Sequence, residues 1–221
     1  MKRFILKISN LKLNAVSYGV LFVAGWISSL PTAMAAELSG YVMQVQMTPA
    51  VCSLDRNSAK RRKCLEGYAL TISALLPETT KRSCTAKTAA NLSPLQTQVV
   101  GRVMPEEQVR NALWQSVGGC VPMSASQYFR TIINYAERLK IPPQLTSFED
   151  LVSTQKQLRA NFLKINSSMP SNAIQFNCQK SQGKSLLTEI QVCYRVDGRY
   201  KQCASNVVSS CPSEFIIKGT Y

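Results

Sequence analysis

Eight cysteines place the strongest constraint on how this chain can fold. All of them follow residue 50, and the residues before them have the composition of an export signal. An even number of cysteines in a chain that leaves the cytoplasm predicts four disulfides. A cysteine-only metal site is the alternative, but there is no Cys-x-x-Cys pair and no histidine to share the ligation. We therefore expect no metal, no other cofactor and four disulfides among Cys52, Cys64, Cys84, Cys120, Cys178, Cys193, Cys203 and Cys211.

The N-terminus has the pattern of a secretory signal peptide. A basic start is followed by an apolar run over 15–30 and by Ala33-Met34-Ala35, the small-x-small motif of a signal peptidase site. We predict a signal peptide over 1–35, a single mature domain over 36–221, and a periplasmic or secreted protein. An uncleaved anchor is the alternative, although the apolar run is short and contains serines. We expect no membrane span in the mature chain.

The mature chain is basic. The predicted signal carries four of the 26 basic residues and none of the 12 acidic ones, so the mature balance is 22 minus 12, or +10. A surplus of this size attracts polyanions such as RNA, but a solvated basic surface explains it equally well. The densest cluster, residues 60–63 (KRRK), lies between two cysteines in a segment that we expect to be a loop.

Apolar periodicity predicts strands at both ends of the mature chain and helices between them. Ser124 and Gln127 have the spacing of a capping box at a helix start, Pro142-Pro143 ends that helix, and Pro77 closes the second strand. We expect strands over 41–47, 67–75, 173–178, 186–196, 199–205 and 215–218, helices over 109–117 and 124–139, and two more amphipathic stretches within 148–165. This order favours an α+β fold with an antiparallel central sheet over a parallel sheet.

A hairpin is predicted near the end of the chain. Asp197-Gly198 between two strand-like segments is a strong turn signal. Cys193 and Cys203 flank this turn at distances that let them face each other. We therefore predict a disulfide between them.

Six segments, in order, resemble the ribonuclease T2 family, particularly its bacterial periplasmic branch. Residues 47–52 (MTPAVC) resemble W-x-P-x-x-C, residues 73–77 (SALLP) stand where the family has H-G-L-W-P, and residues 113–120 (LWQSVGGC) stand at E-W-x-K-H-G-T-C. Residues 128–129 (YF), 187–191 (LTEIQ), and Cys211 with 215–221 (FIIKGTY) resemble later landmarks. The resemblance implies a ribonuclease T2-like α+β fold, stapled by Cys84–Cys120, Cys178–Cys211 and Cys52–Cys64 beside the hairpin bridge.

Members of that family cleave RNA with two histidines that transfer protons, assisted by a glutamate and a lysine. The matching positions here are Ser73 and Val117 for the histidines, Leu113 for the glutamate and Ser116 for the lysine. None of these side chains can act as an acid or base near neutral pH. The chain contains no histidine at all, so a shifted alignment cannot supply one. The resemblance therefore predicts a pseudoenzyme that is not an enzyme and acts by binding.

The positions that would hold the substrate also differ from the family pattern. Met47 and Leu76 replace two tryptophans that would stack on bases, while Trp114 is kept, either for binding or as a core residue. We expect an unknown protein partner, with RNA as a weaker candidate. The alternatives are residual or unconventional endoribonuclease activity on RNA, with groups such as Glu66, Glu78, Lys81 or Arg82, and a purely structural role in the cell envelope.

Overall fold

The alternating segment predicted near the start of the mature chain forms β1 (Leu38–Met47), a strand with neighbours on both sides. The computed structural model describes residues 37–54 and 56–220, so the predicted signal peptide lies outside the described residues. Within them, β1 lies between β2 (Leu70–Thr79) and β5 (Lys184–Tyr194), and both pairings are antiparallel.

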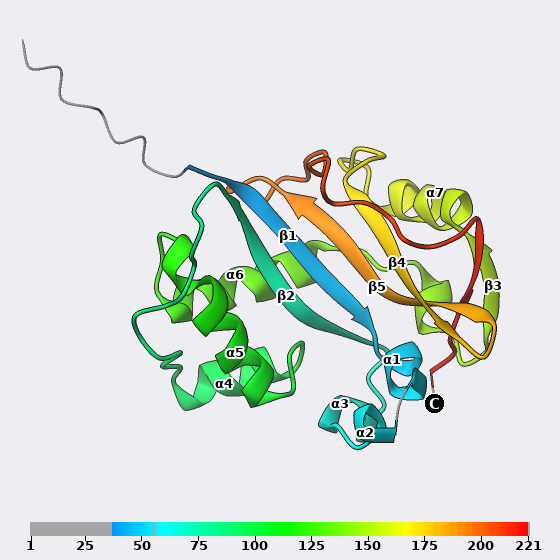
Figure 1. Ribbon diagram of the computed structural model, residues 1–221, viewed down its shortest axis with the longest axis horizontal. Helices are drawn as coiled ribbons and strands as arrows, with labels where there is room; N and C mark the ends of the chain where they lie inside the picture. Colours follow the sequence, from blue (N-terminus) through cyan, green and yellow to red (C-terminus); the bar gives the residue numbers. More distant parts are fainter. Residues whose placement is uncertain (1–36, 55, 221) are drawn as a thin grey trace, which may run out of the picture. The chain divides into compact units, whose positions relative to one another are not determined.

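The remaining strands extend the sheet beyond β5. The strand order is β2-β1-β5-β6-β3, and β4 (Ile174–Ser181) pairs with β5 off this path. β6 (Glu214–Ile217) meets β5 in parallel and pairs antiparallel with β3 (Leu151–Thr154). Apart from the β5–β6 contact the sheet is antiparallel, which confirms the expected α+β class (Figure 1).

β2 continues through Pro77, where the sequence pattern predicted its end. A proline cannot donate a hydrogen bond to a neighbouring strand, so it is tolerated only where one side of a strand is unpaired. β2 is an edge strand of this sheet, and Pro77 pairs with Tyr41 of β1. The prediction was wrong because the position of a strand within the sheet is not encoded in its local pattern.

Two predicted helices form, with ends within two residues of those expected. α6 (Ala125–Arg138) begins with the predicted capping box between Ser124 and Gln127, and α5 (Glu107–Val117) precedes it. Four further helices were not predicted from the sequence: α4 (Pro94–Gly101) and the short helices α1 (Thr48–Leu54), α2 (Arg56–Ala59) and α3 (Arg62–Leu65). Two short 3-10 helices, Gly118–Cys120 and Pro143–Thr146, complete this part of the chain.

Two later segments differ from the predictions. Residues 148–165 contain the strand β3 and one helix, α7 (Gln155–Ile165), where two amphipathic stretches were expected. Residues 199–205 form no strand, and only an isolated bridge joins Tyr200 to Tyr194. The backbone there bonds both to β5 and to a loop: the amide of Lys201 donates to the carbonyl of Cys193, and the amide of Cys203 donates to the carbonyl of Asn172, each at 3.0 Å.

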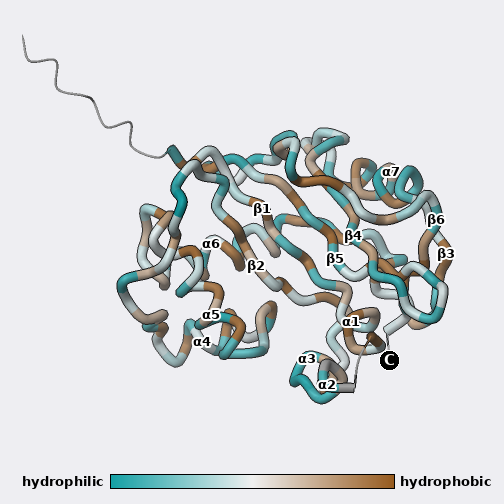
Figure 2. The backbone as a smooth tube through the Cα atoms, viewed as in Figure 1, coloured by the Kyte–Doolittle hydropathy of each residue, from teal (hydrophilic) through white to brown (hydrophobic). Residues whose placement is uncertain are grey.

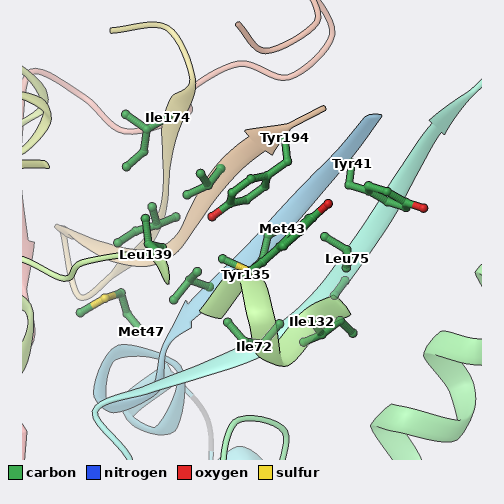
Figure 3. Packing of buried hydrophobic residues seen from close by; sticks show 14 of the residues in the cluster. Tyr41, Met43, Met47, Ile72, Leu75, Ile132, Tyr135, Leu139, Ile174 and Tyr194 are labelled. Carbon is green, nitrogen blue, oxygen red and sulfur yellow. The ribbon is translucent and has the colours of Figure 1, made fainter. Parts of the chain in front are cut away.

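The hydrophobic core lies on one face of the sheet, beneath α6 and α7. Along the strands, hydrophobic and hydrophilic residues alternate, so that one face becomes apolar (Figure 2). Residues of β1, β2, β5 and α6, among them Tyr41, Leu75 and Ile132, meet in this core (Figure 3). The rings of Tyr135 and Tyr194 stack with centroids 4.5 Å apart and join α6 to β5.

All four expected disulfides are present: Cys52–Cys64, Cys84–Cys120, Cys178–Cys211 and Cys193–Cys203. The last closes the base of the turn at residues 195–200, as the hairpin signal predicted. In this turn the amide of Gly198 donates to the carbonyl of Arg195 at 3.0 Å, and Gly198 has a positive φ of 81°. Glycine adopts that conformation without the steric cost that a side chain would add.

Candidate functional site

The face of the sheet opposite the core carries polar side chains in rows. Val45 and Ile190 are paired and face the core, so the next pair along the strands, Gln46 and Glu189, faces the other way. Gln44 pairs with Gln191 on this same side. We refer to Gln44, Gln46, Asn177, Glu189 and Gln191 as the polar sheet face.

Glu189 is the carboxyl of this face and is half-buried. One carboxylate oxygen, Oε1, accepts hydrogen bonds from the side-chain amides of Asn177 at 3.3 Å and Gln191 at 3.0 Å. Burial raises the pKa of Glu189 above its ordinary value, and the two amides offset part of that rise. The two hydrogen bonds therefore hold the carboxyl in place, and its raised pKa favours the protonated, uncharged form more than in an exposed glutamate.

Lys63 reaches the same face from α3. Its side chain is only 4% exposed, and Nζ donates to the side-chain oxygen of Gln46. Burial lowers the pKa of Lys63, partly opposed by the nearby carboxylate of Glu106. The prediction that residues 60–63 form a basic loop was therefore wrong for the second half of this segment. The chain becomes helical at Arg62, and the side chain of Lys63 is buried.

A groove of about 590 Å³ continues from this face toward the start of β1. Val42 and Gln191 line it together with Leu76, Glu78 and Lys201. Glu78 and Lys201 form an ion pair of 2.5 Å, and both side chains are largely covered. The groove therefore presents amide, apolar and paired charged groups, and its lining residue Gln191 donates a hydrogen bond to Glu189, which does not itself line the groove.

Gly40 is required beside this ion pair. A Cβ at residue 40 would lie 2.2 Å from the carbonyl oxygen of Tyr194 and 2.9 Å from a carboxylate oxygen of Glu78. Real Cβ atoms do not approach backbone so closely, so the absence of a side chain here lets the pair lie against the strand.

The four positions that match the family's catalytic residues lie on two elements that pack together, β2 and α5. Ser73 is the extra residue of an irregularity in β2, between the pairs Ile72–Val45 and Ala74–Gln44, and its hydroxyl donates to the carbonyl of Gln44 at 3.3 Å. Leu113 and Val117 are both buried in the hydrophobic core. Ser116 is exposed, and its hydroxyl donates to the carbonyl of Leu113 at 2.8 Å. At the two inward-facing positions of α5, Leu113 and Val117 thus contribute apolar side chains to the core.

The three candidate substrate-holding residues lie in different environments. Met47 is fully buried, and Trp114 is 3% exposed with its ring nitrogen donating to the carbonyl of Thr88 at 2.8 Å. Both side chains, the thioether of Met47 and the indole of Trp114, pack inside the protein. Leu76, at 36% exposed, lines the groove beside the polar sheet face.

The other groups proposed for unconventional catalysis are dispersed. Glu66 pairs with Arg62 at 2.6 Å on the surface, Lys81 donates to the carbonyl of Gly119, and Arg82 is exposed. Only Glu78 lies in the groove. Sequence reasoning missed Glu189, although its alternation with Gln191 in an otherwise apolar strand is a signal for an outward-facing carboxyl.

Two further observations concern the described residues alone. They contain no group of three or more histidine, cysteine, aspartate or glutamate side chains placed to hold a metal ion. Among their helices, none is both long and apolar enough to cross a bilayer.

Comparison with known proteins gives matches by structure only. No protein-family profile and no curated protein sequence matches the chain. Ribonuclease MC1 from bitter gourd seeds superimposes with a TM-score of 0.62 and 16% identity over 80% of this chain and 98% of that chain. A self-incompatibility ribonuclease of Nicotiana alata, SF11-RNase, gives 0.63 and 12% over 80% and 96%. RNase NT in complex with 5′-AMP gives 0.63 and 11% over 84% and 100%.

These matches correct the expectation that the protein is not an enzyme, and they confirm the expected fold. The empty catalytic positions predicted a protein that is not an enzyme, but the proteins that share its structure are ribonucleases, so that prediction was wrong. The absence of histidine excludes a histidine pair, and it does not exclude ribonuclease chemistry by other groups. The four disulfides are consistent with folding in an oxidising compartment. The chain has the fold of the ribonuclease T2 family.

Proposed function

We propose that this chain is an endoribonuclease of the bacterial periplasmic branch of the ribonuclease T2 fold, and that it cleaves RNA without histidine. The observation that carries the proposal is Glu189, a half-buried carboxyl with a raised pKa that is held by two amides, one of which, Gln191, lines the groove. A general base works best when its pKa lies near the working pH, and burial moves a carboxyl in that direction.

The chemistry needs one group that can take and return a proton. The carboxylate of Glu189 accepts the proton of a ribose 2′-hydroxyl as the 2′-oxygen attacks the adjacent phosphorus. The bond from phosphorus to the 5′-oxygen then breaks, and the leaving oxygen takes the proton back from Glu189. The products are a 2′,3′-cyclic phosphate and a 5′-hydroxyl, and Glu189 is again a carboxylate.

Lys63 supports this site by its charge. Its ammonium group contacts Gln46, which pairs directly with Glu189 across β1 and β5. A buried cation raises the positive potential near the phosphate more strongly than an exposed one, because little water screens it. The mature surplus of +10 brings RNA to the surface and makes the encounter dependent on salt.

The experiment is to incubate the purified protein with a short RNA and to measure 2′,3′-cyclic phosphate ends over time. We expect the wild type to produce these ends and Glu189→Gln to lose about 10²-fold or more of the rate. Glu137→Gln, an exposed carboxyl on α6 purified in the same way, is the control and keeps the rate. A wild type that yields no cyclic ends, or a Glu189→Gln variant as active as the control, would overturn the proposal.

The protein partner expected from the sequence stays a separate prediction. A pull-down from periplasmic extract with the Glu189→Gln variant tests it without degradation of bound RNA. Recovery of the same single protein in high salt supports a specific partner, and an empty eluate counts against one.

A further inference from the structure

A second hollow, of about 460 Å³, lies where three segments that are distant in sequence meet. It is bounded by the end of α6, the residues that follow α7, and the turn after β5. Tyr194, which lines it, belongs to the core side of the sheet, where it stacks on Tyr135. The hollow is therefore separate from the polar sheet face and does not share its lining residues with the groove.

The lining is strongly cationic. Arg138, Lys140, Arg195 and Arg199 all contribute to it, and no carboxyl does. Arg199 pairs with the nearby Asp197 at 2.6 Å. The other three side chains form no ion pair with any residue that the structure describes. Of these three, Arg195 also interacts electrostatically with Asp197, and an anion bound among the basic groups reduces their mutual repulsion.

The walls of the hollow are fixed by hydrogen bonds. The buried side chain of Asn166 accepts from the backbone amide of Lys140 at 3.0 Å and from the hydroxyl of Tyr200 at 3.2 Å. Its amide nitrogen donates to the carbonyl of Lys140 at 2.9 Å. One asparagine thus joins the segment after α6 to the turn after β5, at the point where both carry their basic residues.

The turn itself is held against α6. The hydroxyl of Tyr135 lies 3.4 Å from the carbonyl of Arg195 and donates to it, and the amide of Arg195 donates to the carbonyl of Arg199 at 2.8 Å. Gly198 lies close to Arg138, since a Cβ there would be 3.1 Å from a guanidinium nitrogen. The backbone that carries Arg195 and Arg199 is therefore held against α6 before any ligand binds, which lowers the entropic cost of ordering this turn.

We propose that this hollow is a phosphate-binding pocket, which takes the phosphate of a nucleotide or of an RNA chain. Guanidinium groups donate in a fork that matches phosphate oxygens, and an ammonium adds a point charge. The exposed hydroxyls of Ser167 and Ser168 at the rim supply further donors. The volume is within the range of pockets that hold a small organic ligand. The proposal does not rest on cleavage by Glu189.

Titration calorimetry of the purified protein with inorganic pyrophosphate tests the pocket directly. We expect saturable binding that weakens as salt rises, and a loss of at least about tenfold in affinity in the double variant Arg138→Ala/Lys140→Ala. The control Arg130→Ala/Lys156→Ala removes the same charge from exposed positions outside the pocket and keeps the affinity. Arg195→Glu, on the opposite wall, provides a second variant should the first fail to fold.

Further titrations identify the source of the phosphate. Binding of ADP but not adenosine assigns the pocket to a terminal phosphate, and binding of a short RNA without terminal phosphates assigns it to the backbone. Either result supports the pocket if Arg138→Ala/Lys140→Ala abolishes it. No binding of any of the phosphate compounds to the wild type, or equal losses in the pocket and control variants, would overturn the proposal. Cleavage by Glu189→Gln is measured separately, so the two proposals fail independently.

Discussion

Glu189 of β5 lies directly opposite Gln46 of β1, and the side-chain oxygen of Gln46 accepts a hydrogen bond from Lys63. A carboxyl and an ammonium are thereby brought to one row of the sheet from opposite ends of the mature chain. Burial is the first cause of both pKa shifts, upward for Glu189 and downward for Lys63. Both shifts disfavour the charged form, so each predicts a measurable dependence of stability on pH.

Glu189→Gln is expected to gain stability relative to wild type as pH rises from about 4 to about 7. The folded wild type holds the Glu189 proton above the pKa of the unfolded chain, so its stability falls with rising pH until the folded pKa is passed. Glutamine has no proton to lose and escapes this fall. Urea unfolding at both pH values measures the difference, with Glu137→Gln as the control. An equal pH dependence in the two variants would contradict burial of the charge.

Lys63→Met is expected to be most stabilising at neutral pH, with a gain that shrinks as pH rises toward the ordinary lysine pKa of 10.5. Below its lowered pKa in the folded state, Lys63 is charged and desolvated, which costs stability. Between the two pKa values the unfolded chain binds more protons, so the stability of wild type rises with pH. Thermal unfolding across this range measures the effect. Lys60→Met changes an exposed lysine of the same cluster and should show a smaller trend.

Gly40→Ala is expected to lower the free energy of unfolding by about 1–3 kcal/mol. The new Cβ would lie 2.2 Å from the carbonyl oxygen of Tyr194, so β1 and β5 would have to separate. Gly101→Ala is the matched control, because nothing lies within 4 Å of a Cβ in this helical position. It should raise stability by about 0.4–1 kcal/mol through the unfolded chain. Equal effects of the two substitutions in chemical denaturation would contradict the close approach.

Replacing Cys193 and Cys203 with serine is expected to lower the free energy of unfolding by about 3 kcal/mol and to weaken pyrophosphate binding. The bridge closes the base of the turn that carries Arg195 and Arg199. The matched control replaces Cys52 and Cys64, a bridge of similar sequence separation that lies outside the proposed phosphate-binding pocket. Its loss should cost similar stability and leave binding intact. Loss of pyrophosphate binding in both double variants would contradict a specific role in binding for the turn that carries Arg195 and Arg199.

The sequence by itself determined the features that depend on local periodicity and on spacing. Alternation predicted β1, the capping box at Ser124 placed the start of α6, and Asp197-Gly198 placed the bridge between Cys193 and Cys203. The order of segments and cysteines was sufficient for the ribonuclease T2-like fold. Each of these features depends on the spacing or order of residues along the chain, so it can be predicted from the sequence pattern.

Only the tertiary structure decided which groups are chemically unusual. Whether a charge is buried depends on elements that fold over it from elsewhere, as α3 brings Lys63 onto the sheet and β4 brings Asn177 to Glu189. Pro77 is tolerated within a strand only because β2 is an edge strand. The proposed phosphate-binding pocket is lined by three separate segments between residues 138 and 200, and no local sequence pattern connects them. Desolvation and charge clustering are properties of distances in space, and those distances are fixed only when the chain has folded.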